Sequence, residues 1–274
     1  MGICKDPVLT YLNSSGYNVV RLPRAGIEPL DVLGRDGKSL EKLGSITEVW
    51  TSSNPAPQPG PPMPVAGLNG KATADLDIAV GLKLLAGALS GLGAAVGLPT
   101  LGLAYKDAKS VQFTIQNAVS VSISEFAIGK FLSAGRLDLT NPFVAGYFGN
   151  EETQEYILMD VLKSDTISVT AKDDSGTEIK LDIPALQNVM GANVNVKVAT
   201  TSQREIVYQG KTQITFGFKA FEALFEDGTW KVRGAAATAG MAYTAAAASA
   251  GSGAATPVGA GAGILLGPSG FTRI

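Results

Sequence analysis

Residues 109–124 read KSVQFTIQNAVSVSIS, and this stretch decides the fold class. From Val111 to Ile123, apolar side chains occupy the odd positions, except for Asn117, while the even positions are mostly hydroxyl or amide residues. A period of two is typical of a strand with one apolar and one polar face. The polar face carries no charge, whereas a half-exposed strand of a water-soluble sheet usually places Lys, Glu or Asp there.

Two interpretations of this stretch remain open. It fits a strand of a soluble sheet, and it also fits a strand of a membrane barrel, which needs about 9–11 alternating residues with a polar face toward a water-filled lumen. Under the second interpretation the side chains facing lipid are Val111, Phe113, Ile115, Val119, Val121 and Ile123.

The rest of the chain predicts an antiparallel α+β protein. Strands are expected at residues 17–22, 30–33, 45–51, 166–171, 177–183, 193–198, 206–209, 213–218 and 230–233. Turns are expected at 172–176, 210–211 and 226–229, where Gly, Asp or Lys interrupt the apolar pattern. Helices are expected at 7–15, 124–134 and 154–162, and the Pro-rich residues 53–64 predict a loop.

Residues 78–105 form an apolar segment in which no charge occurs between Lys83 and Lys106. The run is longer than the roughly 18 apolar residues expected of a membrane span. Its glycines and a proline make it a helix that breaks easily. Small residues four apart, such as Gly87 and Gly91, fit a helix-packing pattern. A buried helix in a soluble core is the alternative interpretation.

The C-terminal segment carries no charge between Arg233 and Arg273, and Ala and Gly dominate it up to Gly263. Five apolar side chains follow this flexible linker at the end of the chain: Ile264, Leu265, Leu266, Phe271 and Ile274. Their burial yields at most about 7–15 kcal/mol, and ordering residues 264–274 costs about 1–2 kcal/mol each. Because these contributions nearly cancel, the tail is held mainly by its tethered local concentration. Cutting the tether is therefore predicted to release it, whereas the simpler interpretation is a plain flexible tail.

Composition excludes several classes of function. The net charge of −2 provides no overall basic field for nucleic acid. No histidine occurs, which excludes Ser-His-Asp and Cys-His catalysis, and a single cysteine excludes an intramolecular disulfide and a Cys-based zinc site. Ser39 and Lys42 have the Ser-x-x-Lys spacing of penicillin-binding enzymes but lack the companion motifs. We therefore expect no enzyme, no metal and no cofactor.

The opening residues resemble those of bacterial gasdermins. The resemblance lies in residues 6–12 (DPVLTYL), 16–24 (GYNVVRLPR) and 26–30 (GIEPL), and it covers roughly the first fifty residues. It implies a twisted antiparallel sheet with peripheral helices, here residues 1–240, followed by a linker and a short autoinhibitory tail, residues 241–274. It also implies that Cys4 is palmitoylated, although one acyl chain anchors a protein only marginally.

The resemblance further implies how such a protein acts. A partner protease removes the tail, and the body oligomerises into a large β-barrel pore in the inner membrane and kills the phage-infected cell. Because no signal peptide begins the chain, the uncleaved form is expected in the cytoplasm.

Acidic residues are absent after Asp227, and the basic residues beyond it are Lys231, Arg233 and Arg273. We therefore expect cleavage after a small or aliphatic residue between Met241 and Pro257, a window that includes Ala248 and Gly251. Two other functions fit the same features: an apolar-ligand or lipid-binding module, and a structural assembly protein. The first predicts a truncated monomer that releases no dye from liposomes, and the second predicts ordered assembly in water without lipid.

Overall fold

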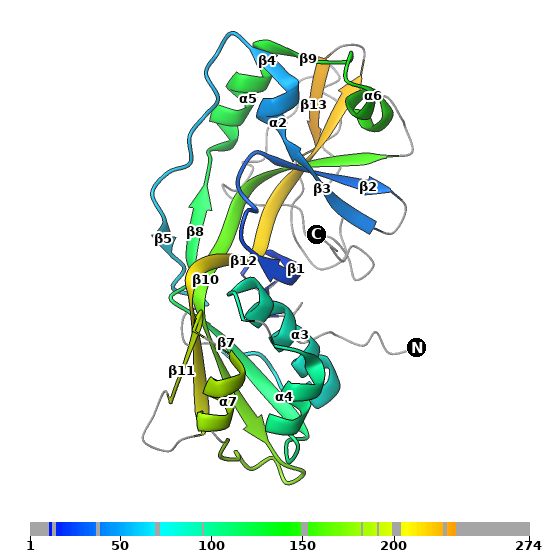
Figure 1. Cartoon of the computed structure of the whole chain (residues 1–274). Helices are drawn as coiled ribbons and strands as arrows, with labels where there is room; N and C mark the ends of the chain where they lie inside the picture. Colours follow the sequence, from blue (N-terminus) through cyan, green and yellow to red (C-terminus); the bar gives the residue numbers. More distant parts are fainter. Residues whose placement is uncertain are drawn as a thin grey trace, which may run out of the picture.

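Two long antiparallel strands, β10 (Gln154–Lys172) and β12 (Glu205–Glu226), run the length of the molecule (Figure 1). The computed structural model describes residues 11–12, 15–36, 39–68, 72–94, 96–148, 153–181, 183–190, 192–198, 204–226 and 229–233. The ladder between β10 and β12 extends from the pair Glu155 and Ala223 to the pair Thr170 and Glu205. Every other part of the main sheet is arranged around this ladder.

Shorter strands flank the ladder in three successive zones. Along β12 they are β11 (Val194–Val198), β1 (Asn18–Arg24) and β13 (Thr229–Arg233). Along β10 they are β7 (Ser110–Gln116), β8 (Val119–Ser122) and β2 (Asp31–Asp36). We call the zone of β7 and β11 the lower half, that of β1 and β8 the waist, and that of β2 and β13 the upper half. Three peripheral strands complete the sheet: β3 (Ser39–Ser45) on β2, β5 (Met63–Pro64) on β8, and β6 (Leu76–Asp77) on β7.

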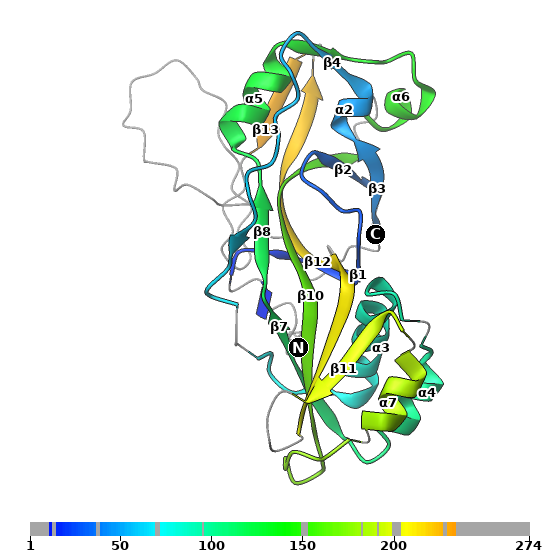
Figure 2. The same ribbon diagram turned by 60° about the vertical axis from the view of Figure 1, so that its left-hand side comes forward.

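Helices cover the two halves separately. In the lower half lie α3 (Ile78–Gly91), α4 (Leu98–Ala104) and α7 (Ile183–Met190) (Figure 2). In the upper half lie α2 (Ile46–Val49), α5 (Glu125–Ser133) and α6 (Pro142–Phe148), together with a small sheet of β4 (Trp50–Ser52) and β9 (Gly135–Leu137). The hydrophobic core is divided in the same way, into a lower, a waist and an upper cluster of buried side chains.

The ladder is irregular at the waist. Its register shifts between Leu158 and Asp160, between Leu162 and Lys163, and between Ser164 and Thr166. Bulges of this kind bend a strand and increase its local twist. Val161 belongs to the waist cluster and its neighbour Leu162 to the lower cluster, so the two faces of β10 contribute to different cores. The ladder therefore extends along both long strands despite these shifts, and each face of β10 packs in a different core cluster.

The expected fold class is confirmed: the protein is α+β, with a large antiparallel sheet and peripheral helices. The helix expected at 124–134 is α5, and the turn expected at 226–229 leads from β12 into β13. The helix expected at 154–162 is wrong, because these residues form the first half of β10. Both faces of this half are buried, so no period of two marks it as a strand.

Three further expectations are wrong. Residues 206–218 form no hairpin, since β12 continues through Gly210, although its register on β10 shifts between Gln209 and Ile214. A Cβ atom at Gly210 would lie only 2.8 Å from Leu92. Residues 45–51 contain the short helix α2, capped by the Ser45 hydroxyl, which accepts from the Thr47 amide. The strand expected at 177–183 is reduced to a bridge at Glu178 before α7 begins. Of the helix expected at 7–15, the described residues 11–12 are helical.

Candidate membrane-active segments

Strand β7 presents its apolar side chains to the helices of the lower half. Val111 and Ile115 are buried and Phe113 is half-buried. They pack in the lower cluster with side chains of α3 and α4, among them Leu85 and Leu101. One face of the lower sheet is therefore covered by helices through apolar contacts.

The opposite face of the lower sheet carries hydroxyl and amide groups. Thr114 and Ser168 lie opposite one another on β7 and β10. The Glu205 carboxylate of β12 accepts hydrogen bonds from the Ser168 hydroxyl and from the Gln116 amide, the latter at 3.5 Å. The lower sheet is thus amphipathic across several strands, and its second face is polar but sparsely charged.

The alternation in the sequence predicts a single apolar face from Val111 to Ile123, and the structure shows two instead. Asn117 has a φ of 51°, in the left-handed region, and separates β7 from β8. Beyond it Val121 packs in the waist cluster, and Ser120 lies opposite Leu162 of the lower cluster. Because paired residues share a face, the apolar side chains of β8 point to the side opposite those of β7. Ile123 packs in the upper cluster and Val119 is half-buried.

The same apolar face continues across strands that sequence analysis did not propose as membrane segments. Side chains of β10, β11 and β12 alternate between the lower cluster and the polar face. Those in the lower cluster are Leu162, Ile167, Val169, Ala171, Val194, Val196, Ile206, Tyr208, Ile214 and Phe216. Their period of two was legible in the sequence, but it was attributed to ordinary hairpins.

The apolar segment 78–105 breaks where its glycines and its proline suggested. Helix α3 ends at Gly91, Gly93 has a φ of 96°, and Pro99 stands in the first turn of α4. Gly91 packs on strand β1 instead of on a second helix, since a Cβ atom there would lie 2.2 Å from the Pro23 carbonyl oxygen. Among the described residues, none of the helices combines the length and the hydropathy needed to span a bilayer.

An apolar pocket lies between α3, β1 and β7. Leu84 and Ala88 of α3 form one side, and Val19 and Pro23 of β1 form another. The remaining lining is supplied by Tyr11, Leu12, Val20, Thr73, Phe113, Ile115, Ile167 and Phe216. Helix α3 therefore covers the sheet incompletely, with close contact at Gly91 and an apolar space beside it.

Helix α4 is joined to the sheet by a buried pair of phenols. The hydroxyl groups of Tyr105 and Tyr208 lie 2.6 Å apart, and both residues are almost completely buried. Burial raises the pKa of both phenols above its ordinary value. Both are therefore neutral at physiological pH, and the contact between α4 and β12 involves no charge.

A buried carboxylate, Asp160, joins three strands and the residue that precedes β1 at the waist. Its Oδ2 atom accepts from the Tyr17 hydroxyl at 2.9 Å and forms an ion pair with Lys219 at 3.1 Å. Its Oδ1 atom accepts from the Ser120 hydroxyl at 2.6 Å. Burial raises the pKa of Tyr17, and the Lys219 ammonium lies 4.4 Å from the centre of its ring. Strands β8, β10 and β12 and Tyr17, the residue before β1, therefore meet at one charged group.

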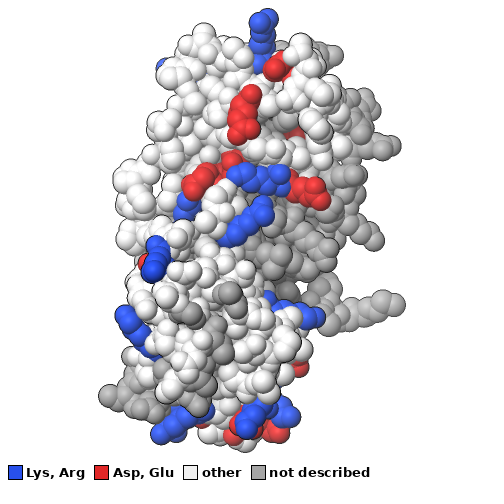
Figure 3. Space-filling model, in the orientation of Figure 1, with Lys and Arg blue, Asp and Glu red and all other residues white. Residues whose placement is uncertain are grey.

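Charges of both signs are mixed on the surface. On the face drawn in Figure 3, Lys and Arg lie beside Asp and Glu across the middle of the molecule and again at its lower end. The predicted lipidation site Cys4, the cleavage window from Met241 through Ala248 and Gly251 to Pro257, and the tail residues Ile264, Leu265, Leu266, Phe271 and Ile274 lie outside the described residues. They remain predictions, as do the boundaries 1–240 and 241–274.

Comparisons with known proteins agree with the resemblance at the N-terminus and extend it. The family model described as the Bacterial Gasdermin Family matches residues 20–231. Gasdermin bGSDM of Vitiosangium sp. (strain GDMCC 1.1324) is 37% identical over 234 residues, which are 83% of this chain and 85% of that protein. Gasdermin bGSDM of Lysobacter enzymogenes is 35% identical over 234 residues, 83% of this chain and 84% of that protein.

A solved structure supports the same assignment at the level of the fold. It is that of a bacterial gasdermin from Bradyrhizobium tropiciagri, with a TM-score of 0.61 and 18% identity over 83% of this chain and 90% of that chain. The sequence matches extend well beyond the first fifty residues and cover most of the sheet. The chain therefore belongs to the bacterial gasdermin family, whose members form pores and are not enzymes.

Proposed function

We propose that this chain is the autoinhibited form of a pore-forming protein that is activated by proteolysis. Cleavage between Met241 and Pro257 removes the tail that ends in Ile274. The body then assembles with further copies of itself into a large β-barrel in the inner membrane. Opening of the pore kills the cell, which serves defence against phage. Before cleavage the protein resides in the cytoplasm, and its partners are the activating protease, membrane lipid and other copies of the chain.

The amphipathic lower sheet is the observation that carries this proposal. Its strands place apolar side chains on one face, under α3, α4 and α7, and polar side chains on the other. A barrel strand needs one face that is compatible with hydrocarbon and one compatible with water. Exchanging the covering helices for lipid would keep the apolar face out of water. Elongated strands such as β10 and β12 supply the length that a barrel strand needs.

The apolar pocket beside α3 supports a role for acylation at Cys4. Tyr11 and Leu12, which line the pocket, follow Cys4 by seven and eight residues. A chain of that length extends at most about 25–29 Å, so an acyl group on Cys4 is within reach of the pocket. We propose that the palmitoyl group packs against the mouth of this pocket in the autoinhibited form and enters the membrane after cleavage. The same pocket is the feature that favours the second candidate function, an apolar-ligand or lipid-binding module.

Liposome leakage separates these functions. The full chain and a chain ending at Gly251 are added to dye-loaded vesicles, and only the shorter chain is expected to release dye. A soluble lipid-binding module predicts a truncated monomer and intact vesicles. An assembly protein predicts oligomers in water without lipid, which sedimentation detects. Mass spectrometry of the activated protein from cells then locates the cut, and a cut outside residues 241–257 would overturn the predicted window.

A further inference from the structure

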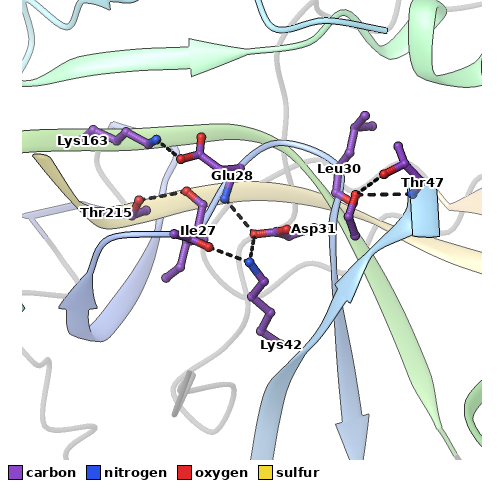
Figure 4. A network of polar contacts seen from close by, with 10 residues as sticks. Ile27, Glu28, Leu30, Asp31, Lys42, Thr47, Lys163 and Thr215 are labelled. Atoms are coloured by element: carbon purple, nitrogen blue, oxygen red, sulfur yellow. Dashed lines mark hydrogen bonds and ion pairs between the residues drawn. The ribbon is translucent and has the colours of Figure 1, made fainter. Parts of the chain in front are cut away.

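The connection between β1 and β2, residues 25–30, crosses the β10–β12 ladder at the waist (Figure 4). We call it the strap. Strand β1 lies on β12 and strand β2 lies on β10, so the strap must pass over both long strands to join them. Three of its residues, Ile27, Pro29 and Leu30, are buried, and Ile27 is completely inaccessible to solvent. The strap is therefore packed onto the sheet along its course.

Polar contacts fix the strap to both long strands. The Glu28 carboxylate forms an ion pair with Lys163 of β10. The Thr215 hydroxyl of β12 donates to the Ile27 carbonyl at 3.1 Å, and the Leu30 amide donates to the Leu158 carbonyl of β10 at 2.8 Å. Lys163 and Thr215 are themselves opposite one another in the ladder. One short connection thus holds both members of a strand pair.

The end of the strap is fixed from its other side by β3. Lys42 donates to the Gly26 carbonyl and forms an ion pair with Asp31 at 2.7 Å. The Asp31 carboxylate, which is nearly buried, also accepts from the Glu28 amide at 2.8 Å. The Lys42 ammonium therefore joins the two ends of the strap in a closed loop.

The backbone of the strap is strained where it meets β2. Leu30 has a φ of 73°, in the left-handed region that residues other than glycine rarely adopt. Such a conformation costs free energy and persists only where the surroundings hold it. The Leu30 amide and carbonyl are both bonded, the latter to the Ile46 amide at 2.9 Å. Strain of this kind is concentrated at switch segments, and here it coincides with the register shifts at Leu158 and Lys163.

We infer that the strap is a clamp that holds the waist of the sheet in its bent form, and that its release limits the rate of the conversion to a pore. This inference rests on the proposed function. Straightening the ladder would move Lys163 and Leu158 relative to Thr215. The strap could then not keep its contacts with all three residues. The Lys163–Glu28 ion pair is the contact that can be removed with least disturbance, because Glu28 is about half exposed.

The chain supplies a matched control for this ion pair on the same strand. Lys172 of β10 forms an ion pair with Asp75 outside the waist. The two lysine side chains are 13% and 18% exposed, and both partner carboxylates are 49% exposed. Lys163→Met and Lys172→Met thus make the same chemical change in nearly the same surroundings, once at the strap and once away from it.

Two measurements test the clamp. In the chain ending at Gly251, Lys163→Met is expected to speed dye release at least threefold, and Lys172→Met to leave it unchanged. In the full chain, amide hydrogen exchange at residues 158–164 is expected to rise for Lys163→Met alone. Glu28→Gln, a change at the half-exposed partner, should reproduce both effects, and the swap Glu28→Lys with Lys163→Glu should restore the parent values.

The inference is overturned if the two lysine variants leak at the same rate, or if exchange at the waist is the same in both. A parent chain ending at Gly251 that releases no dye would instead sink the proposed function. The exchange comparison uses the full chain without vesicles, so it still decides whether the strap holds the waist.

Discussion

The two halves of the β10–β12 ladder bury different kinds of side chain. The lower cluster consists of apolar side chains with a few neutral phenols, among them the mutually bonded Tyr105 and Tyr208. The upper half buries the Glu155 carboxylate, which is 6% exposed and whose Oε1 atom has no hydrogen-bond partner among the described residues. A face that is to meet hydrocarbon cannot include a carboxylate without a large cost. The difference indicates that the lower half, and not the upper half, is suited to enter a membrane.

The waist lies between the two halves, and a substitution of Asp160 there is expected to have the largest effect on stability. Asp160→Ala leaves the Lys219 ammonium, 17% exposed, without its ion-pair partner and removes the acceptor of the Tyr17 and Ser120 hydroxyls. Losing one member of a buried pair typically costs about 3–5 kcal/mol. Chemical denaturation of the full chain should therefore show a loss of that order. An unfolding free energy within about 0.5 kcal/mol of the parent would mean that the waist is held by its apolar contacts alone.

Two glycine substitutions, one in α3 and one in α4, test how closely the helices of the lower half pack on the sheet. Gly91→Ala places a methyl group against the Pro23 carbonyl of β1, so α3 must move away from the sheet at a cost of about 1–3 kcal/mol. Gly102→Ala in α4 meets no atom within 4 Å and should stabilise the protein by up to about 1 kcal/mol. Thermal unfolding measures both. Similar shifts in the two variants would show that α3 does not need its close approach to β1.

The upper half is tested by Glu155→Gln, for which the smallest effect is expected. Burial raises the pKa of Glu155 above its ordinary value of 4.5. The folded protein then holds this proton more tightly than the unfolded chain, so stability is lost as the pH rises through the raised pKa. The neighbouring Glu222 carboxylate acts in the same direction as burial and raises this pKa further.

Glu155→Gln introduces a neutral amide that cannot ionise, so the variant does not lose stability as the pH rises. Its advantage over the parent in unfolding free energy should be near zero at pH 4, grow as the pH rises above about 4.5, and reach about 1 kcal/mol at pH 7. Denaturant titrations across this range measure the difference. An advantage that does not change with pH would show that the pKa of Glu155 is the same in the folded protein as in the unfolded chain.

Sequence alone predicted the lower half better than the rest. The alternation from Val111 to Ile115 identified β7, and the same period identified β11 and the ends of β10 and β12. The first half of β10 was missed because Tyr156, Ile157 and Leu158 are all buried, so no polar face interrupts the run. Gly210 predicts a turn by its residue type, whereas in the structure it makes room for Leu92.

The waist could not be predicted, because its contacts join residues far apart in the chain. Tyr17 and Asp160 are separated by 143 positions, and Thr215 and Ile27 by 188. No local pattern encodes such pairs. Val121, a lipid-facing candidate from the sequence, is one such case: it is buried in the waist cluster, so a charge placed there would cost stability in the soluble fold.

The central claim, that the apolar face of the lower sheet exchanges its helices for lipid, is tested most directly on β7. Single cysteines at Phe113 and Gln112, which occupy opposite faces, are labelled with an environment-sensitive dye in a Cys4→Ser chain ending at Gly251. With vesicles, the dye at 113 should be quenched by nitroxide-labelled lipid and the dye at 112 by aqueous iodide. If lipid and iodide quench the two positions equally, β7 does not form a membrane strand and the account is wrong.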